Sequence, residues 1–241
     1  MQTNTKLRNL TIISEIHPQH YGSMSEIKRM IIQSKIGGAD IVKLQLYDSK
    51  KLWGDDKRTH LDITKDELVE IDEFCKFQGI ELSASIFDLE RVDWCSELNF
   101  KTYKIASRSV TDKELCEKII SLNKTTIVSL GMYDYQKNGK PFKDNKNISY
   151  LYCVSKYPTP LYEIKMPDFK TSFFSGYSDH TIGISACLFA VSKGAIILEK
   201  HFSNSKAMNV ETSPGHTGSM NMNDLIQIRE LSDNLRLLNS E

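Results

Sequence analysis

The sequence predicts a single α/β domain that covers residues 1–241 and folds as a parallel (β/α)₈ barrel, or TIM barrel. Short apolar runs of strand length alternate with helix-like segments along almost the whole chain. The length of 241 residues also suits one such barrel, which usually needs about 250. Polar residues follow strand after strand, as they do at the active-site end of such barrels. A doubly wound open sheet is the alternative arrangement of the same elements.

The strands are predicted from runs of mainly apolar residues that are bounded by turn formers. Their few polar residues stand out, such as Glu15 near the end of the first run and Lys43 and Gln45 inside the second. In chain order, we expect strands at 10–16, 40–46, 80–86, 102–106, 125–130, 149–154, 173–177 and 195–198.

The helices are predicted from apolar residues at three- and four-residue spacing. Ser23 is suited to cap the first helix, with Glu26 three residues further on, and Gly37 is suited to end it. The segment at 162–169 has room only for a short helix. In chain order, we expect helices at 23–36, 64–77, 89–98, 111–122, 162–169, 184–191 and 223–238.

One repeat of the barrel is incomplete. Residues 131–147 show no apolar periodicity and are rich in turn formers, so we predict that the fifth helix is missing or reduced to a turn. Residues 48–62, which include Trp53, are expected to form a polar loop. Neither segment can cover the sheet with a full-length helix.

Composition excludes several classes of protein. Lys plus Arg and Asp plus Glu number 31 each, so no global charge favours nucleic acid or an anionic membrane. No segment approaches the roughly 18 apolar residues of a membrane span, and the N-terminus lacks the apolar core of a signal peptide. The five cysteines are odd in number and lie in apolar segments, which favours free buried thiols in a reducing cytosol. We therefore expect a cytoplasmic protein.

Two polar clusters end the last two predicted strands, and each contains a histidine. His180 follows one strand and His201 follows the next, 21 residues later. Since both clusters lie at the active-site end of a barrel, the two imidazoles could meet and hold a metal ion. The alternative is that the histidines are separate, one capping a helix and the other packed inside the barrel.

Lysines and hydroxyls recur at the ends of the other strands. Lys43 and Lys104 interrupt apolar strands, where a cation is costly unless it meets an anion. Together with neighbouring hydroxyls, two such lysines could form a cradle for a phosphate and a carboxylate. The alternative is that the lysines lie at strand edges and the serines cap helices. The hydroxyls in question belong to Ser85, Ser107, Ser129 and Ser155.

Motifs in a shared order make the chain resemble the sialic acid synthases, a family that includes the legionaminic and pseudaminic acid synthases. The motifs match the catalytic barrel alone, and we expect the chain to lack the family's C-terminal antifreeze-like domain. The matching motifs are S-E-I-x5-G-S at 14–23, G-A-D-I-V-K-L-Q at 38–45, Y-K-I-A-S at 103–107, S-L-G-M at 129–132, Y-P-T-P at 157–160, S-D-H-T-I-G at 178–183, E-K-H-F at 199–202 and H-x-x-S at 216–219.

The resemblance implies a chemistry and a set of residues. The family condenses phosphoenolpyruvate with an aldose, uses a divalent metal and releases phosphate; the metal would be Mn²⁺, with Mg²⁺ or Co²⁺ as alternatives. His180 and His201 would bind the metal, and Tyr157 would lie near the sugar. Glu15 and Glu199 would lie beside the metal, and we expect these two and Tyr157 to be catalytic. The expected substrate-binding residues are Lys43, Gln45, Ser85, Lys104, Ser107, Ser129, Ser155 and Ser178.

The chain departs from the family's pattern on the side that would bind the sugar. Arg108 and Ser109 stand where the family has a small residue and an acidic one, and Ser155 stands in place of an asparagine. The family's P-G-P-D-H pattern is altered to S-P-G-H, which ends at His216. These changes favour an acceptor other than N-acetylmannosamine, such as one with an anionic group. A homodimer or a partner protein would then complete the sugar site.

Two other functions remain open at this stage. A metal-dependent aldolase or isomerase that acts on a sugar phosphate could use the same barrel, histidines and lysines. A non-catalytic barrel subunit would agree with the loss of the acidic residue at Ser109. The buried charges of Lys43 and Lys104 count against such a subunit, because a scaffold gains nothing from keeping them.

Overall fold

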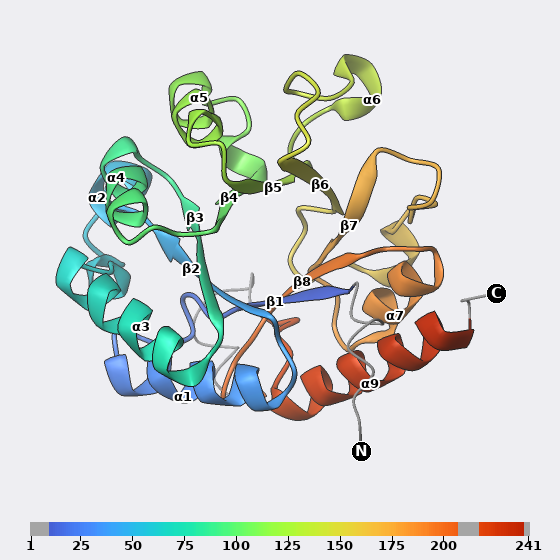
Figure 1. The fold of residues 1–241 in the computed structure, drawn as a ribbon, viewed down its shortest axis with the longest axis horizontal. Coiled ribbons are helices and arrows are strands. Elements are labelled where there is room, and N and C mark those ends of the chain that lie inside the picture. Colours follow the sequence, from blue (N-terminus) through green and yellow to red (C-terminus); the bar gives the residue numbers. More distant parts are fainter. Residues whose placement is uncertain (1–9, 207–216, 239–241) are drawn as a thin grey trace.

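The computed structural model describes residues 10–206 and 217–238, which form a closed barrel of eight parallel strands (Figure 1). Neighbouring strands in the chain pair with one another, and β8 closes the barrel by pairing with β1. The predicted (β/α)₈ barrel is therefore confirmed, and the open sheet is excluded. The strands are β1 (Thr11–Glu15), β2 (Ile41–Leu46), β3 (Glu81–Ile86), β4 (Thr102–Ile105), β5 (Thr125–Ser129), β6 (Ile148–Cys153), β7 (Phe174–Asp179) and β8 (Ile197–His201).

Helices surround the barrel, and α1, α3 and α9 lie next to one another along one side of it (Figure 1). Ser23 caps α1 as predicted, and Thr64 forms a capping box with Glu67 at the start of α3. None of the described helices is long and apolar enough to cross a membrane. The helices are α1 (Met24–Ile36), α2 (Ser49–Trp53), α3 (Lys65–Gln78), α4 (Leu89–Glu97), α5 (Lys113–Ser121), α6 (Tyr135–Asn138), α7 (Ser185–Ser192) and α9 (Met222–Leu238).

Two apolar cores hold the barrel together. The larger one lies between the strands and the surrounding helices. The smaller one fills the inside of the barrel; we call it the apolar plug. The plug closes the N-terminal half of the barrel to water, as packed side-chain layers do in this fold. Its members are Ile13, Ile41, Ile127, Leu151 and Ile197.

A polar layer lies directly above the apolar plug. Because side chains alternate along a strand, the residue two positions after each plug residue points to the same side of the sheet. All of these residues are polar or carry a thiol, and all are buried. On each of these strands the sequence thus changes within two residues from an apolar side chain to a polar or thiol-bearing one, and this change positions the candidate site. The residues are Glu15, Lys43, Ser129, Cys153 and Glu199.

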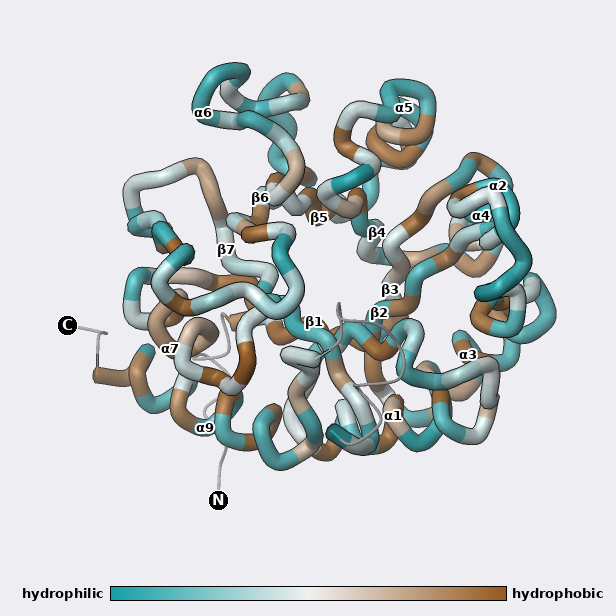
Figure 2. The backbone as a smooth tube through the Cα atoms, turned by 180° about the vertical axis from the view of Figure 1, so that it is seen from behind, coloured by the Kyte–Doolittle hydropathy of each residue, from teal (hydrophilic) through white to brown (hydrophobic). Residues whose placement is uncertain are grey.

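The weak fifth repeat was predicted correctly. Only the four-residue helix α6 follows β5, where a full helix would complete the pattern. Figure 2 shows the α6 segment as largely hydrophilic, so it has no apolar stripe to pack against the sheet.

Three local predictions were wrong. The loop at 48–62 contains the short helix α2, which Asp48 caps and Gly54 ends in a left-handed conformation. The helix at 162–169 is absent except for a 3₁₀ turn at Leu161–Glu163, because Pro167 restricts the backbone before it. Strand β7 extends into the polar cluster that was expected to follow it, as far as Asp179, and β8 extends through its cluster to His201.

Candidate active site

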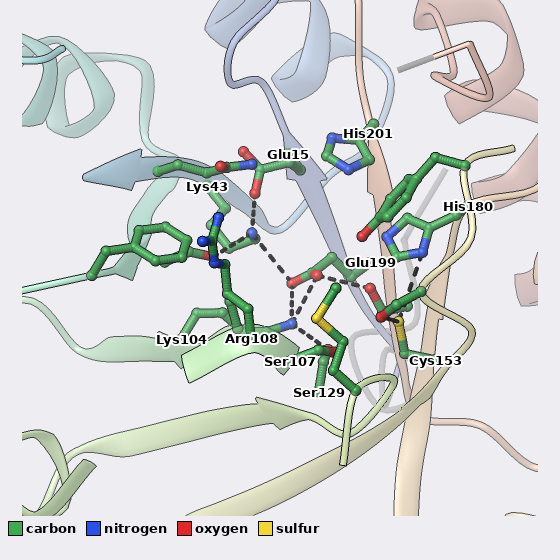
Figure 3. Close-up of a pocket in the computed structure, with 18 of the residues that line it drawn as sticks. Glu15, Lys43, Lys104, Ser107, Arg108, Ser129, Cys153, His180, Glu199 and His201 are labelled. Atoms are coloured by element: carbon green, nitrogen blue, oxygen red, sulfur yellow. Dashed lines mark hydrogen bonds and ion pairs between the residues drawn. The ribbon is translucent and has the colours of Figure 1, made fainter. Parts of the chain in front are cut away.

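A cavity of about 550 Å³ lies above the apolar plug, and every residue of the predicted site lines it (Figure 3). The eight strands contribute these side chains from their C-terminal ends and from the segments that follow. The structure thus brings together residues that are far apart in the sequence, while their roles stay a prediction. The residues are Glu15, Lys43, Gln45, Ser85, Lys104, Ser107, Ser129, Ser155, Tyr157, Ser178, His180, Glu199 and His201.

The floor of the cavity is formed by two lysine–carboxylate pairs. Lys43 Nζ donates to Glu15 Oε2 and, at 2.9 Å, to Ser85 Oγ. Lys104 Nζ donates to both carboxylate oxygens of Glu199, at 2.8 and 2.9 Å. Lys43 Nζ is also 3.7 Å from Glu199 Oε2, which joins the two pairs into one network.

Hydroxyl groups complete this network. Ser129 Oγ accepts a hydrogen bond from Lys104 at 2.7 Å, and Ser178 Oγ donates to Glu199 at 2.9 Å. Each charged group of the floor therefore has an ionic partner and at least one further hydrogen bond or charge nearby. These side chains need such partners because they are almost fully removed from water.

The balance between burial and ion pairing differs among the four groups of the floor: burial raises the pKa of Glu15 and lowers the pKa of Lys104, whereas charge partners prevail at Glu199 and Lys43. Burial raises the pKa of Glu199, but the positive charges of Lys104 and Lys43 outweigh burial and lower that pKa to about 2. Burial lowers the pKa of Lys43, whereas the charges of Glu15 and Glu199 raise it, and the net direction is upward. The lysines predicted to cradle an external anion are thus already paired with protein carboxylates.

His180 and His201 form one wall of the cavity. Their ring centroids are 5.6 Å apart, and the Tyr157 ring lies 4.2 Å from His180 and 6.5 Å from His201. His180 Nδ1 lies 2.9 Å from the Val154 carbonyl oxygen, which can only accept, so Nδ1 carries a proton. In neutral His180, Nε2 then keeps its lone pair.

The histidine pair fits a metal ion only in part. A ligand histidine usually has its second nitrogen fixed by a hydrogen bond, as His180 has through Val154. Within residues 10–206 and 217–238, no three His, Cys, Asp or Glu side chains are arranged to hold a metal. His180 and His201 could therefore supply two nitrogen ligands, and oxygens of substrate or water would have to complete the coordination shell.

Some sequence features near the site prove to be structural. Asp179, next to His180, faces away from the cavity and pairs with Lys200 at 2.7 Å. Ser107 Oγ accepts a hydrogen bond from the Gly131 N–H at 3.0 Å, so this serine also fixes a loop. His216 and the altered S-P-G-H motif lie outside the described residues.

Sequence reasoning missed Tyr47 and the two histidines that support it. The Gly22 N–H donates to His20 Nδ1 at 3.0 Å, so the proton of neutral His20 is on Nε2. His20 Nε2 then donates to His17 Nδ1 at 3.0 Å, and His17 Nε2 donates to Tyr47 Oη at 2.6 Å. This relay fixes Tyr47 as an acceptor from His17. Gly22 is required here, because a Cβ would lie 2.3 Å from the His60 carbonyl oxygen.

Other cavity residues also escaped prediction. Trp53 and Arg58 come from the segment that was expected to be a plain loop, and Cys153 is the inward-facing residue that ends β6. The same-side spacing of Lys43, Gln45 and Tyr47 could have revealed Tyr47, because all three lie at alternate positions. No periodic signal marks Trp53 or Arg58.

Comparison with known proteins identifies the family. A sequence model described as the NeuB family matches residues 30–240. The chain belongs to the NeuB family. The N,N'-diacetyllegionaminic acid synthase of Campylobacter jejuni subsp. jejuni serotype O:2 is 32% identical, over 93% of this chain and 77% of the relative. Human N-acetylneuraminate-9-phosphate synthase is 27% identical, over 90% of this chain and 67% of the relative.

Solved structures agree with this NeuB family assignment at the level of the fold. The N-acetylneuraminic acid (sialic acid) synthetase of Leptospira borgpetersenii serovar Hardjo-bovis, crystallised with citrate, has a TM-score of 0.84 and 24% identity. The match covers 96% of this chain and 85% of that one. The resemblance to sialic acid synthases that the motifs indicated is therefore confirmed.

The relay predicts a loss of stability in mild acid. Burial, followed by the charge of His60, lowers the pKa of His20 from 6.5 to about 4. The unfolded chain therefore binds more protons between these values, and stability falls as the pH drops through this window, by about 3 kcal/mol. Urea unfolding at pH 7 and pH 4 measures this. The glutamine of His20→Gln can donate and accept hydrogen bonds but does not titrate, so this variant should lose less unfolding free energy between pH 7 and pH 4 than the unaltered chain. Equal losses in the two proteins would contradict the assignment to His20.

Proposed function

We propose that this NeuB-family chain is a carbon–carbon bond-forming transferase that condenses phosphoenolpyruvate with an aldose. Carbon 3 of phosphoenolpyruvate forms a bond to the aldehyde carbon, and the aldehyde oxygen takes up a proton. Water adds at carbon 2, and the carbon–oxygen bond to phosphate breaks. The products are a 3-deoxy-2-keto sugar acid, similar to the acids named for its relatives, and inorganic phosphate.

One observation carries this proposal: two lysines and four hydroxyls on the floor of the cavity lie beside a wall with two histidines. The floor offers donors to the phosphate and carboxylate of phosphoenolpyruvate. Each ammonium group has three N–H donors, so Lys43 and Lys104 can donate to the ligand's anionic oxygens while their carboxylate partners hold them in place. Ser85, Ser129 and Ser178 are already within hydrogen-bond distance of this network. Ser107 lines the same cavity.

The wall would hold the aldehyde. A divalent metal ion at His180 and His201 would polarise the aldehyde oxygen towards attack. The imidazole pair favours a transition metal over Mg²⁺, and the expectation of Mn²⁺ rests on the resemblance to the family. Burial raises the pKa of Tyr157, so its hydroxyl stays protonated and can donate to the sugar.

Glu15 and Glu199 act through the lysines in this proposal. Each carboxylate holds one ammonium group in a fixed position, at the point where the phosphate would arrive. Preorganised charges of this kind lower a barrier because they need not reorient during the reaction. Gln45 and Ser155 line the cavity above the floor and would contact the sugar.

We also propose a cytoplasmic protein whose sugar site is completed by another chain. All five cysteines are free and buried, which suits a reducing compartment. Tyr157 is 37% exposed although it belongs to the candidate site, so the acceptor end of the cavity is open to water. A second copy or a separate protein that covers this end would exclude water from the reaction.

The first prediction is that the chain releases inorganic phosphate from phosphoenolpyruvate when Mn²⁺ and a suitable aldose are present. The measurement is a phosphate assay across a panel of aldoses, with and without a chelator. His180→Ala and His201→Ala should each abolish the metal-dependent rate, since each removes a ligand and not core volume. An aldolase or isomerase would convert sugar phosphates without consuming phosphoenolpyruvate, and that result would refute the proposal.

The second prediction concerns the floor. Lys43→Met and Lys104→Met should each weaken phosphoenolpyruvate binding by about 2 kcal/mol or more, because each removes a partner of a desolvated anion. Calorimetric titration measures this loss. Each variant leaves a buried carboxylate unpaired, which itself destabilises the fold. The double variant Lys43→Met/Glu15→Gln restores the charge balance and should bind phosphoenolpyruvate as weakly as Lys43→Met. Wild-type affinity in this folded double variant would place the ligand elsewhere.

A further inference from the structure

Across the cavity from the histidine wall, Tyr47, Arg58 and Arg108 surround the ring of Trp53. We call these three side chains the outer donor cluster. The Tyr47 ring is 4.7 Å from the Trp53 ring, and the guanidinium carbons of Arg58 and Arg108 are 4.8 and 5.8 Å from it. All of these side chains line the cavity, and Figure 3 shows Arg108 on the side of Lys43, opposite His180 and His201.

The two arginines carry charge that the described parts of the chain do not balance. Within those residues, no carboxylate lies within 4.0 Å of Arg58 or Arg108. The other cations of the cavity differ in this respect. Lys43 and Lys104 pair with carboxylates on the floor, and Lys156 pairs with Glu163. The lysines of the floor thus have carboxylate partners, while the two arginines of this outer wall have none within 4.0 Å among the described residues.

Tyr47 adds a directed donor to the same wall. Its oxygen already accepts from His17, so its own proton is available to point elsewhere. Burial and the charge of Asp62 raise the pKa of Tyr47, so the hydroxyl stays protonated. In the described part of the chain, no residue accepts a hydrogen bond from it, and its side chain borders the cavity. The relay through His20 and His17 therefore leaves Tyr47 as a donor to a ligand.

We propose that the outer donor cluster binds an anionic group, a phosphate or carboxylate, at the end of the acceptor aldose remote from the aldehyde. A site built only of donors, two of them guanidinium groups, selects an oxyanion over a neutral hydroxyl. The cluster lies across the cavity from His180 and His201. An extended aldose could therefore place its aldehyde at the histidine wall and its anionic end at the cluster. The proposal rests on the function proposed above, because it assumes that the acceptor occupies this cavity.

The outer donor cluster lies above the floor of the cavity, and this position assigns it to the acceptor sugar and not to phosphoenolpyruvate. Lys43, Gln45 and Tyr47 lie at alternate positions of one strand and its end, so Tyr47 is two layers above the floor lysine. The phosphate of phosphoenolpyruvate is proposed to bind at the floor. An anion held by Tyr47, Arg58 and Arg108 is therefore a second anion.

The test compares aldoses with and without a terminal anion. The probes are N-acetylmannosamine and its 6-phosphate, arabinose and its 5-phosphate, and glucose and glucuronate. Each is titrated calorimetrically into the full chain, which requires no turnover, and kcat/KM is then measured for those that react. We expect the anionic member of at least one pair to bind about tenfold or more tightly than its neutral partner.

Four variants locate the effect. Arg58→Met and Arg108→Met should each weaken binding of the preferred anionic sugar about tenfold or more, and Tyr47→Phe about threefold to tenfold, without affecting the neutral partner. Lys57→Met is the matched control, because it removes the neighbouring exposed charge outside the cavity and should change nothing.

Three results would overturn the proposal. The first is equal binding of neutral and anionic sugars by the unaltered chain. The second is an equal loss of affinity for the anionic sugar in Lys57→Met and Arg58→Met, which would show that the effect is only a long-range attraction by positive charge. The third is a matching loss of phosphoenolpyruvate or inorganic phosphate affinity in Arg108→Met, which would assign the cluster to the floor ligand. Binding of anionic sugars without phosphate release would instead support this site and refute the condensation.

Discussion

The site depends on one constraint: two cations and two carboxylates are buried directly above an apolar plug. Ile13 and Ile41 close the barrel, and two residues later the same strands carry Glu15 and Lys43. Charges in this position have little contact with water, so each must meet an opposite charge. The closed barrel supplies those partners, because it brings β8 and its Glu199 next to β1 and within reach of Lys104.

From this constraint follows a division of the cavity into three regions. The floor presents two buried lysines, each held in place by a carboxylate, to the oxyanions of a ligand. The histidine wall offers nitrogen lone pairs, and the opposite wall offers only donors. A reaction that joins an anionic three-carbon unit to an aldehyde needs the first two regions, and an acceptor with its own anion would need the third. The relay from His20 through His17 suits this division, because it orients Tyr47 at the cost of two buried, neutral imidazoles.

Much of this could be predicted from the sequence, because its signals are local. Periodicity located the strands and most helices, and Lys43 or Glu199 stands out inside an apolar run. What could not be predicted depends on closure of the barrel or on very short elements. Lys104 and Glu199 are 95 residues apart, so their pairing has no local signal. Helix α2 has only five residues, too few for a periodic signal, so Trp53 at its end was not predicted to line the cavity.

The most direct test of the central claim is a crystal structure of the chain with phosphoenolpyruvate and Mn²⁺. The account predicts phosphate oxygens within about 3 Å of Lys43 Nζ and Lys104 Nζ, and carbon 3 directed towards His180 and His201. Binding of the phosphate at Arg58 and Arg108, with both lysine–carboxylate pairs left intact on the floor, would contradict it.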